Sequence, residues 1–179
     1  MWNQDLYKRA LDFAARAHGD QKVPGSGFPY VVHVTKVAME VLHATRDGAL
    51  RADLAMPCAL LHDCIEDGGP TWEEPLRAEF GDAVADGVRA LSKDAAVAKP
   101  DRMADALRRI RAQPKEIWAV KLADRITNLE PPPPAWTPEK RRRYLAEAKQ
   151  ILDALRGASP SLEQRFERKM REYEAYCAG

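Results

Sequence analysis

The sequence predicts an all-α fold with a single domain, and three observations support this prediction. Apolar residues recur at helical spacing in most segments of the chain. Clusters of proline and glycine separate these segments, as expected where one helix ends and the next begins. No stretch alternates between apolar and polar residues in the manner of a half-buried strand. Because 179 residues fit one hydrophobic core, we expect one domain over residues 1–179 and one main site.

Three helices are expected in the first part of the chain. The first covers residues 5–17 and ends before a glycine-rich loop. The second covers residues 30–42, follows a proline suited to a helix start, and carries His33 in its first turn. The third covers residues 51–66 and ends at the Gly-Gly-Pro of residues 68–70, so its last turn contains the motif HDCIED.

Shorter helices are expected next. The spacing of residues 71–74, TWEE, is that of a capping box and predicts a short helix after it. Asp82 is expected to cap the following helix. Apolar spacing predicts another helix over residues 103–110, and a proline precedes one over residues 117–129, which carries LADRITNL.

The last part of the chain begins with four prolines, residues 131–134. We expect them to form a stiff extended connector rather than a linker between domains, because too little chain follows for a second core. Thr137-Pro138 and Ser159-Pro160 each combine an N-cap residue with a first-turn proline. They predict two final amphipathic helices, the second over residues 160–177.

Composition excludes several classes of protein. Lysine and arginine number 28 against 27 acidic residues, and the net charge of +1 argues against general nucleic-acid or membrane-surface binding. The three cysteines lack a CxxC spacing and are expected to be packing residues in a reducing cytoplasm. The N-terminus lacks the apolar stretch of a signal peptide, and no segment approaches the roughly 20 apolar residues of a membrane span. We therefore expect a cytoplasmic protein.

The motif HDCIED places four polar side chains together. Glu66 and Asp67 follow His62 and Asp63 at i+4, so on a helix the four point into one sector, one turn apart. The helix that carries them, MPCALLHDCIED, is apolar, and this sector should face inward, where unpaired carboxylates are costly to bury. A divalent cation would remove that cost.

Two further segments offer metal ligands. Asp124 and Asn128 repeat the i, i+4 spacing on the apolar helix KLADRITNL, and His33 offers an imidazole from a third helix. A mixed set of histidine and aspartate suits Mn²⁺, Fe²⁺, Zn²⁺ or Mg²⁺. The absence of cysteine thiolates from the set disfavours a structural zinc site.

Each piece also has a simpler interpretation. The His-Asp pair of residues 62–63 is compatible with a helix C-terminus, and residues 66–67 with a solvated turn. Asp124 is compatible with an ion pair to a neighbouring basic residue, and His33 with a core histidine. His18 is expected to be a structural residue at a helix end. The combination of the segments, rather than any one of them, indicates a metal site.

The chain resembles the hydrolase domain of the RelA/SpoT family of alarmone enzymes. The likeness runs from about residue 6 to residue 155 and rests on four segments in this order: HGDQKVPGSGFPYVVHVTKVA, LLHDCIEDGGPTWEEPLRAEFG, LSKD and VKLADRITNL. No segment resembling a synthetase or regulatory domain follows, so we expect a stand-alone small alarmone hydrolase. The resemblance implies an HD-domain helical bundle, a small-molecule nucleotide substrate, and hydrolysis of the 3′-pyrophosphate of (p)ppGpp with Mn²⁺ or another divalent metal.

The resemblance also implies roles for single residues. The positions that match the family's metal ligands are His33, His62, Asp63 and Asp124. Glu66 and Asp67 match the pair that positions and activates the hydrolytic water. Asn128 matches an amide near the ribose and phosphate, and Tyr144 matches a tyrosine beside the nucleotide. A half-exposed helix aromatic is an equally good interpretation of Tyr144.

One loop departs from the family pattern. Where the family usually has Arg-Lys after the loop glutamine, this chain reads Gln21-Lys22-Val23-Pro24, without a planar arginine to stack on a base. Lys22 and Lys93 are the expected phosphate contacts, whereas the basic run of residues 140–143 is typical of a solvated helix face.

Two alternative functions remain open from the sequence. One is hydrolysis of another nucleotide, such as an adenosine alarmone, NADPH or a nucleoside triphosphate. The other is a catalytically silent HD domain that senses a nucleotide, which the intact ligand set and the intact Glu66-Asp67 pair argue against. The sequence does not predict an oligomeric state.

Overall fold

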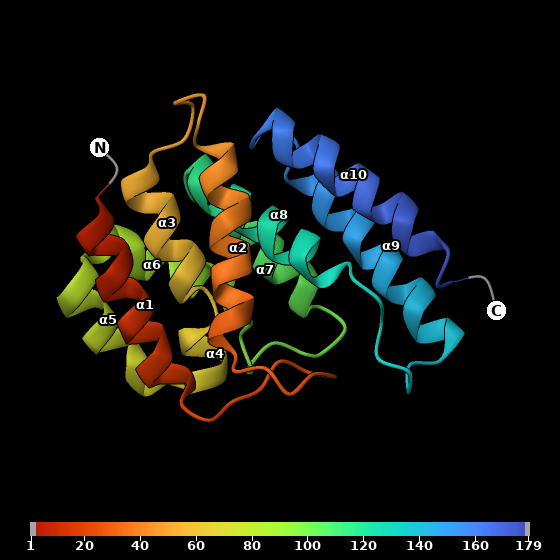
Figure 1. Cartoon of the computed structure of the whole chain (residues 1–179), viewed down its shortest axis with the longest axis horizontal. Helices are drawn as coiled ribbons and strands as arrows, with labels where there is room; N and C mark the ends of the chain where they lie inside the picture. Colours follow the sequence, from red (N-terminus) through yellow and green to blue (C-terminus); the bar gives the residue numbers. More distant parts are fainter. Residues whose placement is uncertain (1–2, 178–179) are drawn as a thin grey trace.

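The structure, a computed structural model, describes residues 3–177 as helices joined by loops (Figure 1). This described part contains no β-strand, which confirms the all-α prediction, and an isolated antiparallel bridge joins Lys22 to Pro29. A 3₁₀ turn, η1, covers Pro70–Trp72. The α-helices are α1 Gln4–His18, α2 Val31–Ala44, α3 Ala52–Leu61, α4 Cys64–Gly68, α5 Glu73–Phe80, α6 Asp82–Leu91, α7 Arg102–Arg111, α8 Lys115–Asn128, α9 Pro138–Ala154 and α10 Pro160–Glu174.

Helices α2, α3 and α8 form the centre of the fold. Helix α2 packs against both α3 and α8, and α1 packs against α3 (Figure 1). Helices α5 and α6 lie at one end of this centre, α7 packs against α6 and α8, and the pair α9 and α10 packs against α8 at the other end. The three central helices therefore bring together segments that are far apart in the sequence.

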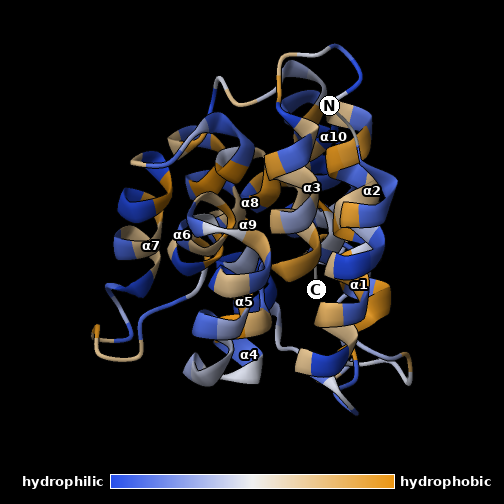
Figure 2. Ribbon diagram, turned by 90° about the vertical axis from the view of Figure 1, so that its left-hand side faces the viewer, coloured by the Kyte–Doolittle hydropathy of each residue, from blue (hydrophilic) through white to orange (hydrophobic). Residues whose placement is uncertain are grey.

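Burial of apolar faces explains this arrangement. Helix α3 is buried from Leu54 to Leu61, as expected for a helix enclosed by others. Outer helices bury one face only: α7 buries Ala106 and Ile110 and exposes its charged side. Figure 2 shows the hydrophobic face of α7 turned toward the neighbouring helices. Within residues 3–177, none of the helices is long and apolar enough to cross a membrane.

The prediction of one continuous helix over residues 51–66 is wrong. Helix α3 ends at Leu61, and α4 begins at Cys64 after a turn in which Asp63 has φ −103° and ψ −2°. The His62 ring contributes to this break, because its Nδ1 lies 2.9 Å from the carbonyl oxygen of Ala59, an acceptor that a continuing helix would use for a backbone N–H. The helical bond from Asp67 N–H to the Asp63 carbonyl, 2.8 Å, resumes the pattern.

Two predicted helix caps are also wrong. Thr71 lies inside η1, which already starts at Pro70, so the capping box does not form and α5 begins without a side-chain cap. Asp82 is the first residue of α6 rather than its cap, because its carboxylate accepts a hydrogen bond from Arg77 at 2.7 Å. By contrast, Thr137 caps α9 as predicted, accepting a hydrogen bond from the backbone N–H of Lys140 at 3.3 Å.

The final helix begins at Pro160 as predicted and ends at Glu174, three residues before the predicted end. Ser159 precedes it, but its hydroxyl lies 3.0 Å from the hydroxyl of Ser161 and caps no backbone N–H. The four prolines form no helix or strand, as predicted for a connector. This connector packs beside the loop between α1 and α2: a Cβ at Gly25 would lie 3.3 Å from Pro133.

Candidate metal centre

The predicted metal ligands converge on one point between the three central helices. His33 comes from the first turn of α2, His62 follows α3, and Asp124 comes from the last part of α8. One ligand atom of each lies within 4.8 Å of the others, and all three residues are buried. Oδ2 of Asp63 lies 2.9 Å from Nε2 of His62 and 3.8 Å from Nε2 of His33. All four side chains that sequence analysis grouped are therefore adjacent.

The two imidazoles present unpartnered nitrogens to this point. His62 is oriented by its Nδ1, 2.9 Å from the Ala59 carbonyl, which accepts only if Nδ1 carries the proton. That tautomer leaves the Nε2 lone pair free. Nε2 of His33 and Nε2 of His62 are both buried without a hydrogen bond of acceptable geometry, although carboxylate oxygens lie nearby. Two buried imidazole nitrogens beside two carboxylates fit a divalent cation, which would satisfy all of them.

Electrostatics within the cluster support the same interpretation. Burial lowers the pKa of His62, but the charge of Asp63 and its interactions with Asp124 outweigh burial and raise this pKa well above its ordinary value. Burial raises the pKa of Asp124, but Lys121 and the two imidazoles outweigh it and lower this pKa well below its ordinary range. Burial raises the pKa of Asp63 as well, but the neighbouring His62 outweighs it and lowers this pKa. Both carboxylates therefore stay ionised, and the cluster attracts either a proton or a metal cation.

Neighbouring donors orient the two carboxylates. Lys121 Nζ donates to Oδ2 of Asp124 at 2.9 Å, and the side-chain amide of Asn128 donates to Oδ1 at 2.7 Å. The Tyr30 hydroxyl donates to Oδ2 of Asp63 at 2.7 Å. Sequence analysis missed Tyr30 as a site residue. Its position three residues before His33, on the same helix face, was a signal that could have found it.

Glu66 and Asp67, the predicted catalytic pair, extend from α4 and are held from two sides. Glu66 accepts hydrogen bonds from the backbone N–H of Lys93 at 2.8 Å and from its Nζ at 2.7 Å. Asp67 accepts one from the side-chain amide of Gln21 at 2.8 Å, and Gln21 in turn lies 2.9 Å from Nδ1 of His18. Sequence analysis did not identify Gln21 as a partner of Asp67, because 46 residues separate them.

A groove of about 450 Å³ opens next to this cluster and shares residues with it. His33 and Asn128 line the groove, so it connects to the metal centre. Apolar side chains make most of the remaining wall, among them Phe28, which is 62% exposed, and Trp136. Another hollow, of about 580 Å³, lies around the loop between α2 and α3 and contains none of the predicted site residues.

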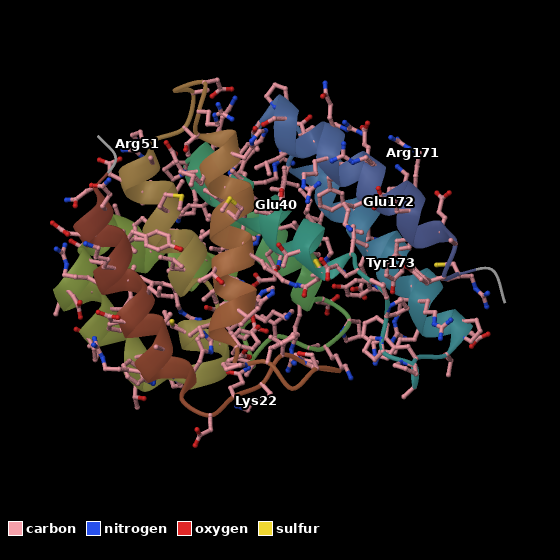
Figure 3. All side chains as sticks on the ribbon, in the orientation of Figure 1. Lys22, Glu40, Arg51, Arg171, Glu172 and Tyr173 are labelled. Atoms are coloured by element: carbon pink, nitrogen blue, oxygen red, sulfur yellow. The ribbon has the colours of Figure 1, made fainter. Side chains whose placement is uncertain are left out.

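Two predicted substrate contacts occupy different positions relative to this groove. Tyr144 lines it and is held by its neighbours: the Arg125 guanidinium lies 4.1 Å from its ring centre, and the Trp136 ring packs edge-on at 5.2 Å. Figure 3 shows Lys22 on the loop between α1 and α2, where it is exposed, and Tyr173 on α10. Lys22 does not line the groove, whereas Tyr173 does. The predicted phosphate contact Lys22 therefore depends on the substrate extending toward this loop.

Comparison with known proteins identifies similar chains. The HD domain family model matches residues 10–159. Two proteins named guanosine-3′,5′-bis(diphosphate) 3′-pyrophosphohydrolase MESH1 are similar: the Danio rerio protein is 30% identical over 162 residues, which cover 88% of each chain. The Homo sapiens protein is 29% identical over 160 residues, which cover 87% of each chain. A solved structure described as "A metazoan ortholog of SpoT hydrolyzes ppGpp and plays a role in starvation responses" superposes with a TM-score of 0.83 at 27% identity, covering 96% of this chain and 97% of the other.

Proposed function

The chain belongs to the HD domain family, and we propose from this membership and from its site that it hydrolyses the 3′-pyrophosphate of (p)ppGpp-like nucleotides and releases pyrophosphate. The observation that carries the proposal is the meeting of two buried, unpartnered imidazole nitrogens with two carboxylates beside a groove. The similar proteins with this named activity span nearly the whole chain. The enzyme is therefore a metal-dependent phosphohydrolase, and one domain over residues 1–179 is part of our proposal.

We propose that four residues hold the divalent metal: His33, His62, Asp63 and Asp124. When bound, the ion supplies a Lewis acid that polarises a phosphoryl oxygen and acidifies water. Manganese is our proposed ion, because the mixed nitrogen and oxygen ligand set suits it and the resemblance to the alarmone hydrolases implies it. Lys121, Asn128 and Tyr30 orient the ligands through the hydrogen bonds described above.

Glu66 and Asp67 are proposed to orient the attacking water and take up its proton. Their carboxylates are positioned by Lys93 and Gln21, so neither needs to reorganise during the reaction. The water oxygen forms a bond to the phosphorus attached to the ribose 3′-oxygen, and the bond between that phosphorus and the 3′-oxygen breaks. The departing 3′-oxygen gains one proton, which balances the proton that the carboxylate pair takes from the water, and pyrophosphate is released.

The groove is proposed to hold the nucleoside. Asn128 and Tyr144 line it near the metal centre, and we keep them as substrate contacts together with Lys22 and Lys93. Another part of the groove wall is made of Phe28, Trp136 and the proline connector, side chains that stack on a base without selecting its hydrogen-bonding edge. This wall does not fix which base the nucleotide carries, so an adenosine alarmone remains the second candidate substrate.

Release of pyrophosphate from (p)ppGpp, measured with Mn²⁺ for the wild type and for Asp124→Ala, tests the proposal. The same assay on an adenosine alarmone, NADPH and nucleoside triphosphates compares the alternative substrates. We expect turnover of (p)ppGpp that needs the metal and Asp124. Binding of (p)ppGpp without any turnover on the panel would instead support the silent nucleotide sensor.

Cytoplasmic location remains a prediction, in line with three cysteines that are all free thiols.

A further inference from the structure

A lysine and a glutamate form an ion pair in the wall of the groove, beside the metal cluster. Lys36 follows His33 by three residues on α2, so both side chains lie on the helix face that lines the groove. The Lys36 ammonium lies 3.6 Å from Oε2 of Glu130, which follows the end of α8. The two side chains are 52% and 51% exposed, so the pair is open to solvent and contributes little to folding stability.

Lys36 is the one lysine or arginine among the described residues that line this groove. The other polar side chains of the lining are neutral or acidic, apart from the proposed ligand His33. A nucleotide that carries a diphosphate on both the 3′ and the 5′ oxygen brings negative charge to two separate places. Each of the two diphosphates is stabilised by a nearby cationic side chain, and Lys36 is a candidate for one of these cations.

The lysines near the metal centre already have acidic partners there. Lys121 donates to Asp124 at 2.9 Å, and Lys93 donates to Glu66 at 2.7 Å. These lysines therefore balance charge on the side where the 3′-diphosphate has to reach the metal. Lys36 lies three residues farther along α2 than His33, a rise of about 4.5 Å, which is comparable with the span of one ribose.

From this placement, we propose that Lys36 binds the 5′-phosphates of the nucleotide and that Glu130 competes with them for the same ammonium group. The inference rests on the proposed function, because it assigns a subsite in the same groove. In this structure, Lys36 pairs with Glu130. When the nucleotide binds, its 5′-phosphate takes the ammonium, and the Glu130 carboxylate stays nearby and repels the anion. Lys36 thus makes binding depend on the 5′-phosphates, and Glu130 limits its strength.

Nucleotide binding to the full-length, metal-loaded protein tests the proposal by calorimetry, without depending on hydrolysis. The ligands are guanosine 5′-diphosphate, which keeps the 5′-phosphates and lacks the scissile group, and guanosine, which lacks both. The variants are Lys36→Met, Lys36→Arg and Glu130→Gln. The matched control is Lys149→Met, because Lys149 also forms an exposed pair, 2.7 Å from Asp153, within α9 and outside the groove.

We expect Lys36→Met to weaken guanosine 5′-diphosphate binding about tenfold, the loss of one charge-assisted contact. Guanosine binding should change less than about twofold, because guanosine carries no phosphate. Lys36→Arg should keep binding within about threefold of the wild type, and Glu130→Gln should strengthen it about threefold. Lys149→Met should have no effect.

Three results would overturn the proposal: no binding of guanosine 5′-diphosphate to the wild type, no loss in Lys36→Met beyond that in Lys149→Met, or an equal loss for guanosine. The (p)ppGpp hydrolysis assay is run in parallel on the wild type. If the wild type fails to hydrolyse (p)ppGpp but shows the Lys36-dependent binding, the proposed reaction is wrong and the 5′-phosphate subsite stands. If it hydrolyses (p)ppGpp but Lys36→Met binds normally, the reaction stands and the subsite is wrong.

Discussion

Replacing Tyr30 with phenylalanine removes a single hydroxyl and tests how the Asp63 carboxylate is oriented. The hydroxyl donates to Oδ2 of Asp63 at 2.7 Å. Burial and the nearby Asp63 charge raise the pKa of Tyr30, so the hydroxyl keeps its proton and remains a donor at neutral pH. A hydrogen bond to a charged group contributes about 1.5–3 kcal/mol, and losing a partner of a metal ligand lowers metal affinity about 10- to 100-fold. We therefore expect the affinity of Tyr30→Phe for Mn²⁺ to be about 10- to 100-fold lower than that of the wild type.

Competition between the protein and a chelator for Mn²⁺ measures this affinity. Tyr176→Phe is the control, because it removes a hydroxyl from a tyrosine that is 37% exposed and lies after α10. Helical content from circular dichroism should be the same in both variants and the wild type. If Tyr30→Phe binds Mn²⁺ as tightly as Tyr176→Phe, the hydrogen bond from Tyr30 does not orient a metal ligand and our reasoning about this residue is refuted.

Three further predictions concern catalysis, selectivity and packing. Glu66→Ala or Asp67→Ala should abolish most turnover while leaving Mn²⁺ content nearly unchanged. Asp124→Ala should lose both turnover and bound Mn²⁺. Equal loss of metal in all three variants would contradict the assigned roles. The wild type should hydrolyse guanosine and adenosine 3′-pyrophosphates with similar kinetics. Val23→Arg should improve guanosine-alarmone binding about tenfold or more, because stacking on a base contributes about 1–3 kcal/mol. A strong guanine preference that Val23→Arg leaves unchanged would place base recognition elsewhere. Gly87→Val should lower the free energy of unfolding by about 1–3 kcal/mol in chemical denaturation, because even a Cβ at Gly87 would lie 2.5 Å from an isoleucine of α8. Unchanged stability would show that α6 and α8 separate easily.

Much of the fold could be predicted from local sequence patterns. The helices α1, α2, α7 and α8 begin and end within a few residues of the predicted bounds, and α9 begins at the predicted proline, because apolar spacing and proline positions act over one or two turns. Thr137 caps α9 as predicted for the same reason. Asp82 shows the limit of such patterns: it could cap α6, but a competing partner, Arg77, takes its carboxylate. A local motif indicates which hydrogen bonds a side chain could form, and the residues that lie near it in the folded chain determine which of them it does form.

The candidate site divides in the same way. The sequence by itself determined which donors are available, His33, His62, Asp63 and Asp124, because spacing and residue type are properties of the chain alone. Only the tertiary structure decided which partners orient them and what surrounds them. Tyr30 reaches Asp63 across 33 residues because α2 packs against α3. Such contacts depend on how helices pack side by side, and helical periodicity in one segment carries no information about which distant segment packs against it.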